Sequence, residues 1–116
     1  MAKPLNYRPV CDDRGNFLPW LSDVSKASGA YVIRNRISRE VLYVGESHTG
    51  QLRKTIVRHF WPHKETIKRH DLYQRGRVEV AVRVCPPGPA AIGCQNNLIQ
   101  RLQPRDNRQG FEPDPF

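Results

Sequence analysis

The clearest pattern in the chain is a strict alternation at residues 77–85, where valine occupies every second position from Val78 to Val84. Alternation with a period of two is typical of a β-strand that has one buried face. Residues 29–35 and 40–45 are also rich in β-branched and aromatic side chains. Because only a short polar segment separates these two runs, they are predicted to form an antiparallel β-hairpin.

The predicted hairpin carries a tyrosine on each strand. We expect Tyr31 to lie opposite Tyr43, with the turn centred on Ile37. In this register Arg34 faces Glu40, and both tyrosines point to the same face of the sheet with their Cβ atoms about 5 Å apart. In most proteins such a pair would be ordinary packing within the sheet.

Residues 51–60 change to a helical pattern, with apolar side chains at every fourth position and basic side chains on another face. The apolar positions are Leu52, Ile56 and Phe60, and the basic positions are Arg53, Lys54 and Arg58. We expect Pro62 to end this helix, because proline restricts the residue before it and cannot donate a backbone hydrogen bond.

Residues 91–107 begin with a second helical pattern, which is expected to stop before Pro104. Its apolar stripe consists of Ala91, Leu98, Ile99 and Leu102. Gln95 falls in or beside this stripe, since residues three, four and seven positions apart share one helical face. An amide at that position is either a hydrogen-bonded core group or part of a functional site.

The order of these elements predicts an α+β domain with a three-stranded antiparallel sheet flanked by helices. Residues 29–107 form the predicted domain, and residues 63–76 form either a further helix or a long loop. Residues 1–28 are interpreted as an N-terminal extension that contains one short helix. Residues 108–116 are interpreted as a loose C-terminal tail.

The chain of 116 residues has a net charge of +8, from 19 lysines and arginines against 11 acids. The basic residues are spread along the predicted domain and are not confined to a tail. A folded basic surface favours an anionic partner, most simply nucleic acid. A basic protein with no such partner is the alternative.

Three cysteines without a CxxC pair favour reduced thiols and an intracellular protein. No signal peptide or membrane-spanning run is apparent.

Two short motifs fail as catalytic or metal sites. The segment at residues 45–50 has the glycine spacing of a phosphate-binding loop, but glutamine and leucine follow where lysine and a hydroxyl residue are required. His59 and His63 have ligand spacing, but Pro62 lies between them and no cysteine pair completes a zinc site. Both histidines are therefore expected on the surface, where they could lie near phosphate.

Three segments together resemble the GIY-YIG nucleases. Gly-Ala-Tyr at 29–31 and Tyr-Val-Gly at 43–45 resemble the paired signature of that family, at similar spacing. Residues 95–107 resemble the family's closing helix, which has a glutamate at its start and an asparagine at its end. The resemblance covers residues 29–107 and implies a small GIY-YIG-like α+β fold.

The resemblance also implies roles for individual residues. Tyr31 and Tyr43 match the family tyrosines that orient or deprotonate the attacking water. Gly45 matches the turn glycine, which would be required for a close backbone approach or a positive φ. Asn107 matches the closing asparagine and is expected to be structural.

The catalytic arginine and the metal-binding glutamate of the family are altered in this chain. Thr55 falls where the arginine is expected, so we assign that role to Arg58, with Arg53 as the other neighbouring arginine. Gln95 replaces the glutamate that would hold one Mg²⁺ or Mn²⁺ ion. Since an amide is a poor ligand for these ions, hydrolysis is expected to be weak or absent unless Glu46 assists. The alternative interpretation of Glu46 is a solvent-exposed acid in a loop. The glutamine is either a natural divergence or an engineered inactivation.

The resemblance thus implies a metal-dependent DNA endonuclease of GIY-YIG type, impaired as written. The expected nucleic-acid contacts are Arg53, Lys54, His59, Lys68 and Arg69. One alternative is a binding module that kept the fold and lost the chemistry, and another is a basic adaptor for an acidic protein. Because no separate specificity domain is evident, we expect recognition of the target to come from the core, from residues 1–28, from a partner or from a homodimer.

Overall fold

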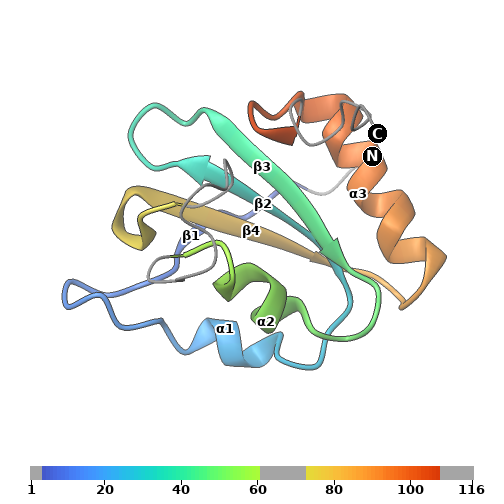
Figure 1. Cartoon of the computed structure of the whole chain (residues 1–116), viewed down its shortest axis with the longest axis horizontal. Helices are drawn as coiled ribbons and strands as arrows, with labels where there is room; N and C mark the ends of the chain where they lie inside the picture. Colours follow the sequence, from blue (N-terminus) through green and yellow to red (C-terminus); the bar gives the residue numbers. More distant parts are fainter. Residues whose placement is uncertain (1–3, 61–72, 108–116) are drawn as a thin grey trace, which may run out of the picture.

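The fold is α+β, with one antiparallel sheet between two helical layers (Figure 1). The computed structural model describes residues 4–60 and 73–107. The strands lie in the order β1-β4-β2-β3. Along the chain the elements are β1 (Arg8–Pro9), α1 (Trp20–Asp23), β2 (Gly29–Asn35), β3 (Val41–Ser47), α2 (Leu52–Val57), a 3-10 turn (Arg75–Arg77), β4 (Val78–Val84) and α3 (Pro89–Leu102). The expected fold class is confirmed, but the sheet has four strands and not three.

The additional strand, β1, comes from the segment that was expected to be an extension. Arg8 and Pro9 pair with β4 at the edge of the sheet. An edge strand tolerates proline, because the backbone groups on its outer side do not have to donate hydrogen bonds to another strand. Val10 and Leu21 from the same segment are fully buried. Residues before Gly29 therefore contribute both a strand and core side chains.

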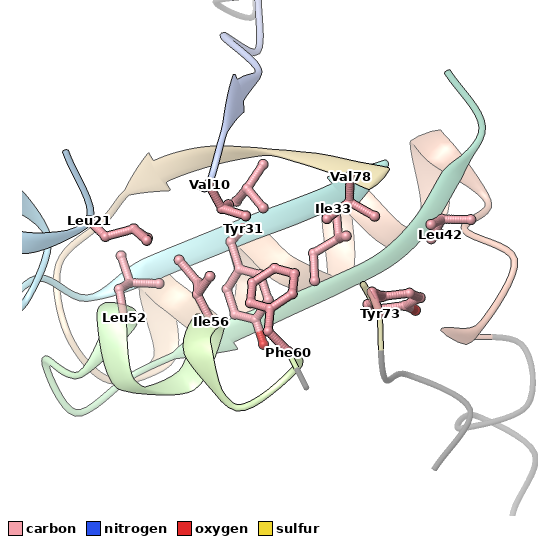
Figure 2. Close-up of a cluster of buried hydrophobic side chains, with 11 residues drawn as sticks. Val10, Leu21, Tyr31, Ile33, Leu42, Leu52, Ile56, Phe60, Tyr73 and Val78 are labelled. Carbon is pink, nitrogen blue, oxygen red and sulfur yellow. The ribbon is translucent and has the colours of Figure 1, made fainter. Parts of the chain in front are cut away.

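The larger core lies between the sheet and the two helices α1 and α2 (Figure 2). Leu52 and Ile56 are fully buried, as their four-residue spacing predicted, and their helix packs against β2 and β3. However, α2 ends at Val57, well before Pro62. The chain then tightens into turns in which the amides of His59 and Phe60 each bond to the carbonyl three residues earlier. This tightening brings Phe60 into the core.

Helix α3 covers the opposite face of the sheet, where Leu98 packs with Ala30, Val32 and Val44. The helix starts at Pro89, where the missing amide hydrogen of proline is not needed. It ends at Leu102, and the capping residue Gln103 adopts a left-handed conformation with φ 50° immediately before Pro104. The expected helix and its end before Pro104 are both confirmed.

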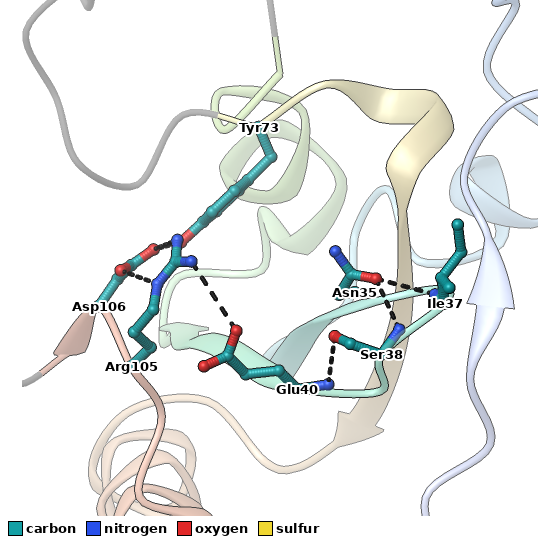
Figure 3. A network of polar contacts seen from close by, with 7 residues as sticks. All are labelled: Asn35, Ile37, Ser38, Glu40, Tyr73, Arg105 and Asp106. Carbon is teal, nitrogen blue, oxygen red and sulfur yellow. Dashed lines mark hydrogen bonds and ion pairs between the residues drawn. The ribbon is translucent and has the colours of Figure 1, made fainter.

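The register of the β2–β3 hairpin differs from the expected one by two residues. Tyr31 lies opposite Gly45, and Tyr43 lies opposite Ile33. The side chain of Asn35 accepts hydrogen bonds from the amides of Ile37 and Ser38 and so shapes the turn (Figure 3). An irregularity follows Ile33, so that Arg34 pairs with Val41 and not with Glu40. Because the shift is an even number of residues, both tyrosines still share one face.

The outer edge of β3 is covered by the segment that follows α3. The amides of Arg105 and Asp106 donate to the carbonyls of Val41 and Leu42. The possible helix at residues 63–76 falls mostly outside the described residues, which show only the 3-10 turn Arg75–Arg77 where it ends. Within residues 4–60 and 73–107, no helix is long and apolar enough to cross a membrane.

Candidate active site

A cavity of about 290 Å³ brings the expected site residues together at the β3 edge of the sheet. Its lining consists of Tyr31, Tyr43, Glu46, Thr55, Arg58, His59 and Gln95. These residues come from β2, β3, α2 with its following turn, and α3, which are separated in the sequence. Every lining residue except Thr55 was expected to belong to the site, and Thr55 occupies the expected arginine position.

The hydroxyl of Tyr31 lies 2.7 Å from Nε2 of His59, and the two side chains are 1% and 3% exposed. Tyr31 points from the middle of β2 toward the end of α2 (Figure 2). The expectation that His59 is a surface histidine is wrong, because the turns after α2 carry the imidazole inward. A phenol and an imidazole at this distance share one proton, which either group can donate to the other.

Aromatic rings surround His59 on several sides. The ring centroid of Tyr43 lies 4.6 Å away, that of Tyr31 5.5 Å away in an edge-on arrangement, and that of Tyr73 6.2 Å away and nearly parallel. The amide of Tyr73 also donates to the carbonyl of His59. The imidazole is therefore held in one position by packing and by the backbone.

Tyr73 connects this ring cluster to a polar network at the end of α3 (Figure 3). Its hydroxyl donates to Oδ2 of Asp106 at 2.5 Å. The guanidinium of Arg105 donates to both carboxylate oxygens of Asp106. Neither Tyr73 nor Asp106 was identified from the sequence. The only available signal was that Asp106 directly precedes Asn107, because the contact itself joins distant parts of the chain.

Gly45 is required by the ring of Tyr31. A Cβ atom at this position would lie 2.3 Å from the hydroxyl oxygen and 2.4 Å from Cζ of that tyrosine. Gly45 is not among the residues with positive φ. Of the two expected reasons for the glycine, close approach to its backbone is therefore the one that applies. The cross-strand pair places the Tyr31 ring directly over the glycine.

Asn107 holds the strand that carries Tyr43 and Gly45. Its Oδ1 accepts a hydrogen bond from the amide of Val44 at 2.7 Å, and its Nδ2 donates to the carbonyl of Val44 at 2.9 Å. The side chain thus replaces a neighbouring strand at this point of the sheet edge. Asn107 has the expected structural contacts and does not line the cavity.

The basic residues near the cavity come mainly from α2. Arg58 is exposed and lines the cavity, while Lys54 is exposed and Arg53 is partly buried on the same helix. Thr55 donates its hydroxyl to the carbonyl of Gln51, so its side chain bonds to the helix itself. Lys68 and Arg69, which were also expected to contact nucleic acid, lie outside the described residues.

The cavity offers a divalent cation one carboxylate and one amide. Glu46 belongs to β3, and its side chain is only 18% exposed, so it is not the loop acid that its flanking sequence suggested. Gln95 is partly buried and lines the cavity, while Ala91 and Leu98 of the same helix form the buried stripe. Magnesium commonly binds one or two carboxylates and retains several waters, so this donor set fits a hydrated ion.

The described residues hold no group of three or more histidine, cysteine, aspartate or glutamate side chains that could hold a metal ion. Among these described residues, the groups at the cavity that could hold a metal are Glu46 and neutral donors, together with substrate oxygens. Comparisons of the sequence with protein-family models and with curated proteins find no match.

Proposed function

We propose that this chain is a DNA endonuclease domain of GIY-YIG type whose phosphodiester hydrolysis is impaired by Gln95. The observation that carries the proposal is the buried hydrogen bond between Tyr31 and His59 at the base of a cavity that Tyr43, Arg58 and Gln95 also line. A fixed proton acceptor beside a cation is the arrangement that hydrolysis of a phosphodiester requires.

Each residue has a role that its position supports. Tyr31 and His59 together accept the proton of the attacking water, because the shared proton can pass from the phenol to the imidazole. Tyr43, whose ring lies against His59, orients that water. Arg58 reaches the phosphate from the exposed rim and balances the charge that develops on it.

A divalent cation, Mg²⁺ or Mn²⁺, would be held by Glu46 and more weakly by the amide oxygen of Gln95, and would polarise the phosphate. A glutamate at position 95 would add a second negative ligand from α3. Its replacement by an amide keeps the shape and one oxygen but removes the charge. Activity of the chain as written is therefore expected to be low.

A non-catalytic nucleic-acid-binding module is the second candidate, and two observations favour it. Gln95 lacks the charge of a metal ligand, and Thr55 is bonded to its own helix where an arginine was expected. The basic face of α2 would remain useful for binding the phosphate backbone without cleavage.

The deciding experiment is cleavage of supercoiled plasmid with Mg²⁺ or Mn²⁺ by this chain, by Gln95→Glu and by Gln95→Glu combined with Thr55→Arg. Restored cleavage in either variant is the expected result, and adding Tyr31→Phe should abolish it. Gln100→Glu is the matched control, because it places the same charge on an exposed position of α3. Folded variants that bind DNA but never cleave it would reject hydrolysis and favour the binding module.

A further inference from the structure

The side chains of Glu46 and His48 form a pair beside the cavity that the roles described above do not include. Nδ1 of His48 lies 3.0 Å from Oε2 and 3.2 Å from Oε1 of Glu46. Glu46 lies in β3, and His48 directly follows the end of that strand at Ser47, so the two residues are two positions apart in the chain. The imidazole nitrogen therefore faces both carboxylate oxygens.

We propose that Glu46 and His48 together form a binding site for a divalent transition metal, and that this site prefers Mn²⁺ to Mg²⁺. This inference deepens the proposed function, on which it rests for the use of the ion in catalysis. The binding site itself stands on the contacts of this chain and is testable without nucleic acid.

The spacing of the donor atoms matches that of two neighbouring ligands on one ion. Metal bonds to imidazole nitrogen or carboxylate oxygen are about 2.1 Å long, so ligands at a right angle are about 3.0 Å apart. The pair already has this separation between Nδ1 and Oε2. A cation could replace the proton that joins the two groups with little movement of either side chain.

The backbone around the pair is held from both sides. Glu46 pairs with Ala30 in the sheet. The carbonyl of His48 accepts a hydrogen bond from the amide of Gly88, immediately before α3 begins. Between them, Ser47 is buried, and its hydroxyl oxygen accepts a hydrogen bond from the backbone amide of Gln51. The donors are thus supported by rigid elements, as a metal site requires.

The two donors differ in their exposure to solvent. The Glu46 side chain is 18% exposed and lines the cavity, while the His48 side chain is 48% exposed and bonds to Glu46 from outside the cavity lining. An ion can reach the imidazole from water and be held by a carboxylate that faces the candidate active site. Gln95 lines the same cavity, and its amide oxygen can supply a further neutral ligand.

The choice of metal follows from the donor types. Magnesium prefers oxygen ligands and retains its waters, whereas imidazole suits transition metals. A site with one carboxylate and one imidazole therefore favours Mn²⁺ over Mg²⁺. The imidazole supplies a further ligand but not the negative charge that is missing at position 95.

The test is titration of the full chain with Mn²⁺ in the absence of nucleic acid, with free Mn²⁺ followed by its electron paramagnetic resonance signal and Mg²⁺ added as competitor. One saturable site is expected. Glu46→Gln and His48→Gln should each weaken Mn²⁺ binding roughly tenfold or more. His48→Gln should in addition remove most of the preference for Mn²⁺ over Mg²⁺. Glu40→Gln is the matched control, since it removes an exposed carboxylate near the other end of β3 and should leave binding unchanged.

Absence of saturable Mn²⁺ binding, or binding that neither substitution weakens, would overturn the inference. Because His48 is exposed, its substitution should not affect folding, so a change in Mn²⁺ binding can be attributed to the site. The proposed function can fail separately: Mn²⁺ bound at this pair in a chain whose Gln95→Glu variant never cleaves DNA would support the site and reject the nuclease. Cleavage by Gln95→Glu with Mn²⁺ binding that is unaffected by His48→Gln would have the opposite meaning.

Discussion

The hydroxyl of Tyr31 and Nε2 of His59 are 2.7 Å apart in a nearly solvent-free position, and this pair joins the hydrophobic core to the candidate active site. Burying a polar group is unfavourable unless it is hydrogen-bonded, so each side chain makes the position of the other tolerable. The same contact that the fold requires also places a proton acceptor in the cavity.

Replacing Tyr31 with phenylalanine should therefore reduce both the stability of the fold and the proposed rate of phosphodiester hydrolysis. The change removes the hydroxyl from His59 and is expected to lower the free energy of unfolding by about 1–3 kcal/mol. Tyr43→Phe removes a hydroxyl from a partly buried residue and should cost less. Urea unfolding of both variants measures the difference. Equal stability of Tyr31→Phe and the parent chain would contradict the assigned hydrogen bond.

Gly45→Ala should be strongly destabilising, because the new methyl group would overlap the Tyr31 ring. Overpacking of this kind typically costs about 1–3 kcal/mol and displaces the intruding side chain. Gly76→Ala is the control, since a Cβ atom there would meet nothing within 4 Å. Thermal unfolding should show a lower midpoint for Gly45→Ala and little change for Gly76→Ala. Similar midpoints for the two variants would show that the ring does not lie over the glycine.

Asn107→Ala should loosen the edge of the sheet. The side chain of Asn107 bonds both the amide and the carbonyl of Val44, and losing two buried backbone partners should cost about 2–4 kcal/mol. Hydrogen exchange at the Val44 amide should accelerate in this variant. Asn96→Ala, at an exposed position of α3, is the comparison and should leave that amide protected. Unchanged protection in Asn107→Ala would argue against this role.

Arg58→Ala should weaken DNA binding and make it less sensitive to salt. If Arg58 contacts a phosphate, its removal lowers the slope of log affinity against log salt by about one. Arg14→Ala removes the same charge from an exposed turn that does not line the cavity. Fluorescence anisotropy across a salt series distinguishes the two. Identical slopes for both variants would mean that Arg58 acts only through net charge.

The pH dependence of stability should include a contribution from Cys94. Burial, followed by a hydrogen bond with the Cys85 thiol, raises the pKa of Cys94 from 9.0 to about 11. Between these values the unfolded chain releases the thiol proton while the folded protein keeps it. The thiol's contribution to stability is therefore complete below pH 9 and is lost as pH rises toward 11. Urea midpoints measured across this range should fall less in Cys94→Ala than in the parent chain, and an equal fall would refute the shift.

Local pattern was sufficient for those elements whose side chains alternate or repeat regularly. β4 follows directly from its valines, and α3 follows from its apolar stripe and from the proline after it. Most residues of the cavity were also expected, because the two short motifs and the closing helix resemble those of a nuclease family. Neither inference depends on how distant segments meet.

The local pattern of residues could not predict which segments pair with one another. β1 is two residues long and contains a proline, so no periodicity marks it, and it is a strand only because β4 offers an unpaired edge. The hairpin register depends on the Asn35 side chain in the turn and on the irregularity after Ile33. Both shift the pairing without changing the alternation that was used to predict it.

The amino-acid sequence by itself determined the α+β class and the faces that are buried, because periodicity and residue type set these locally. Most of the residues that gather at the cavity were implied by the resemblance of three short segments to a nuclease family. Only the tertiary structure decided that His59 is buried against Tyr31, and that Tyr73 and Asp106 support it. It also decided that Glu46 faces His48 and lines the same cavity as Gln95. These relationships arise when α2 ends early and distant segments pack together. Burial and hydrogen bonding between such segments depend on the whole fold and leave no local signature.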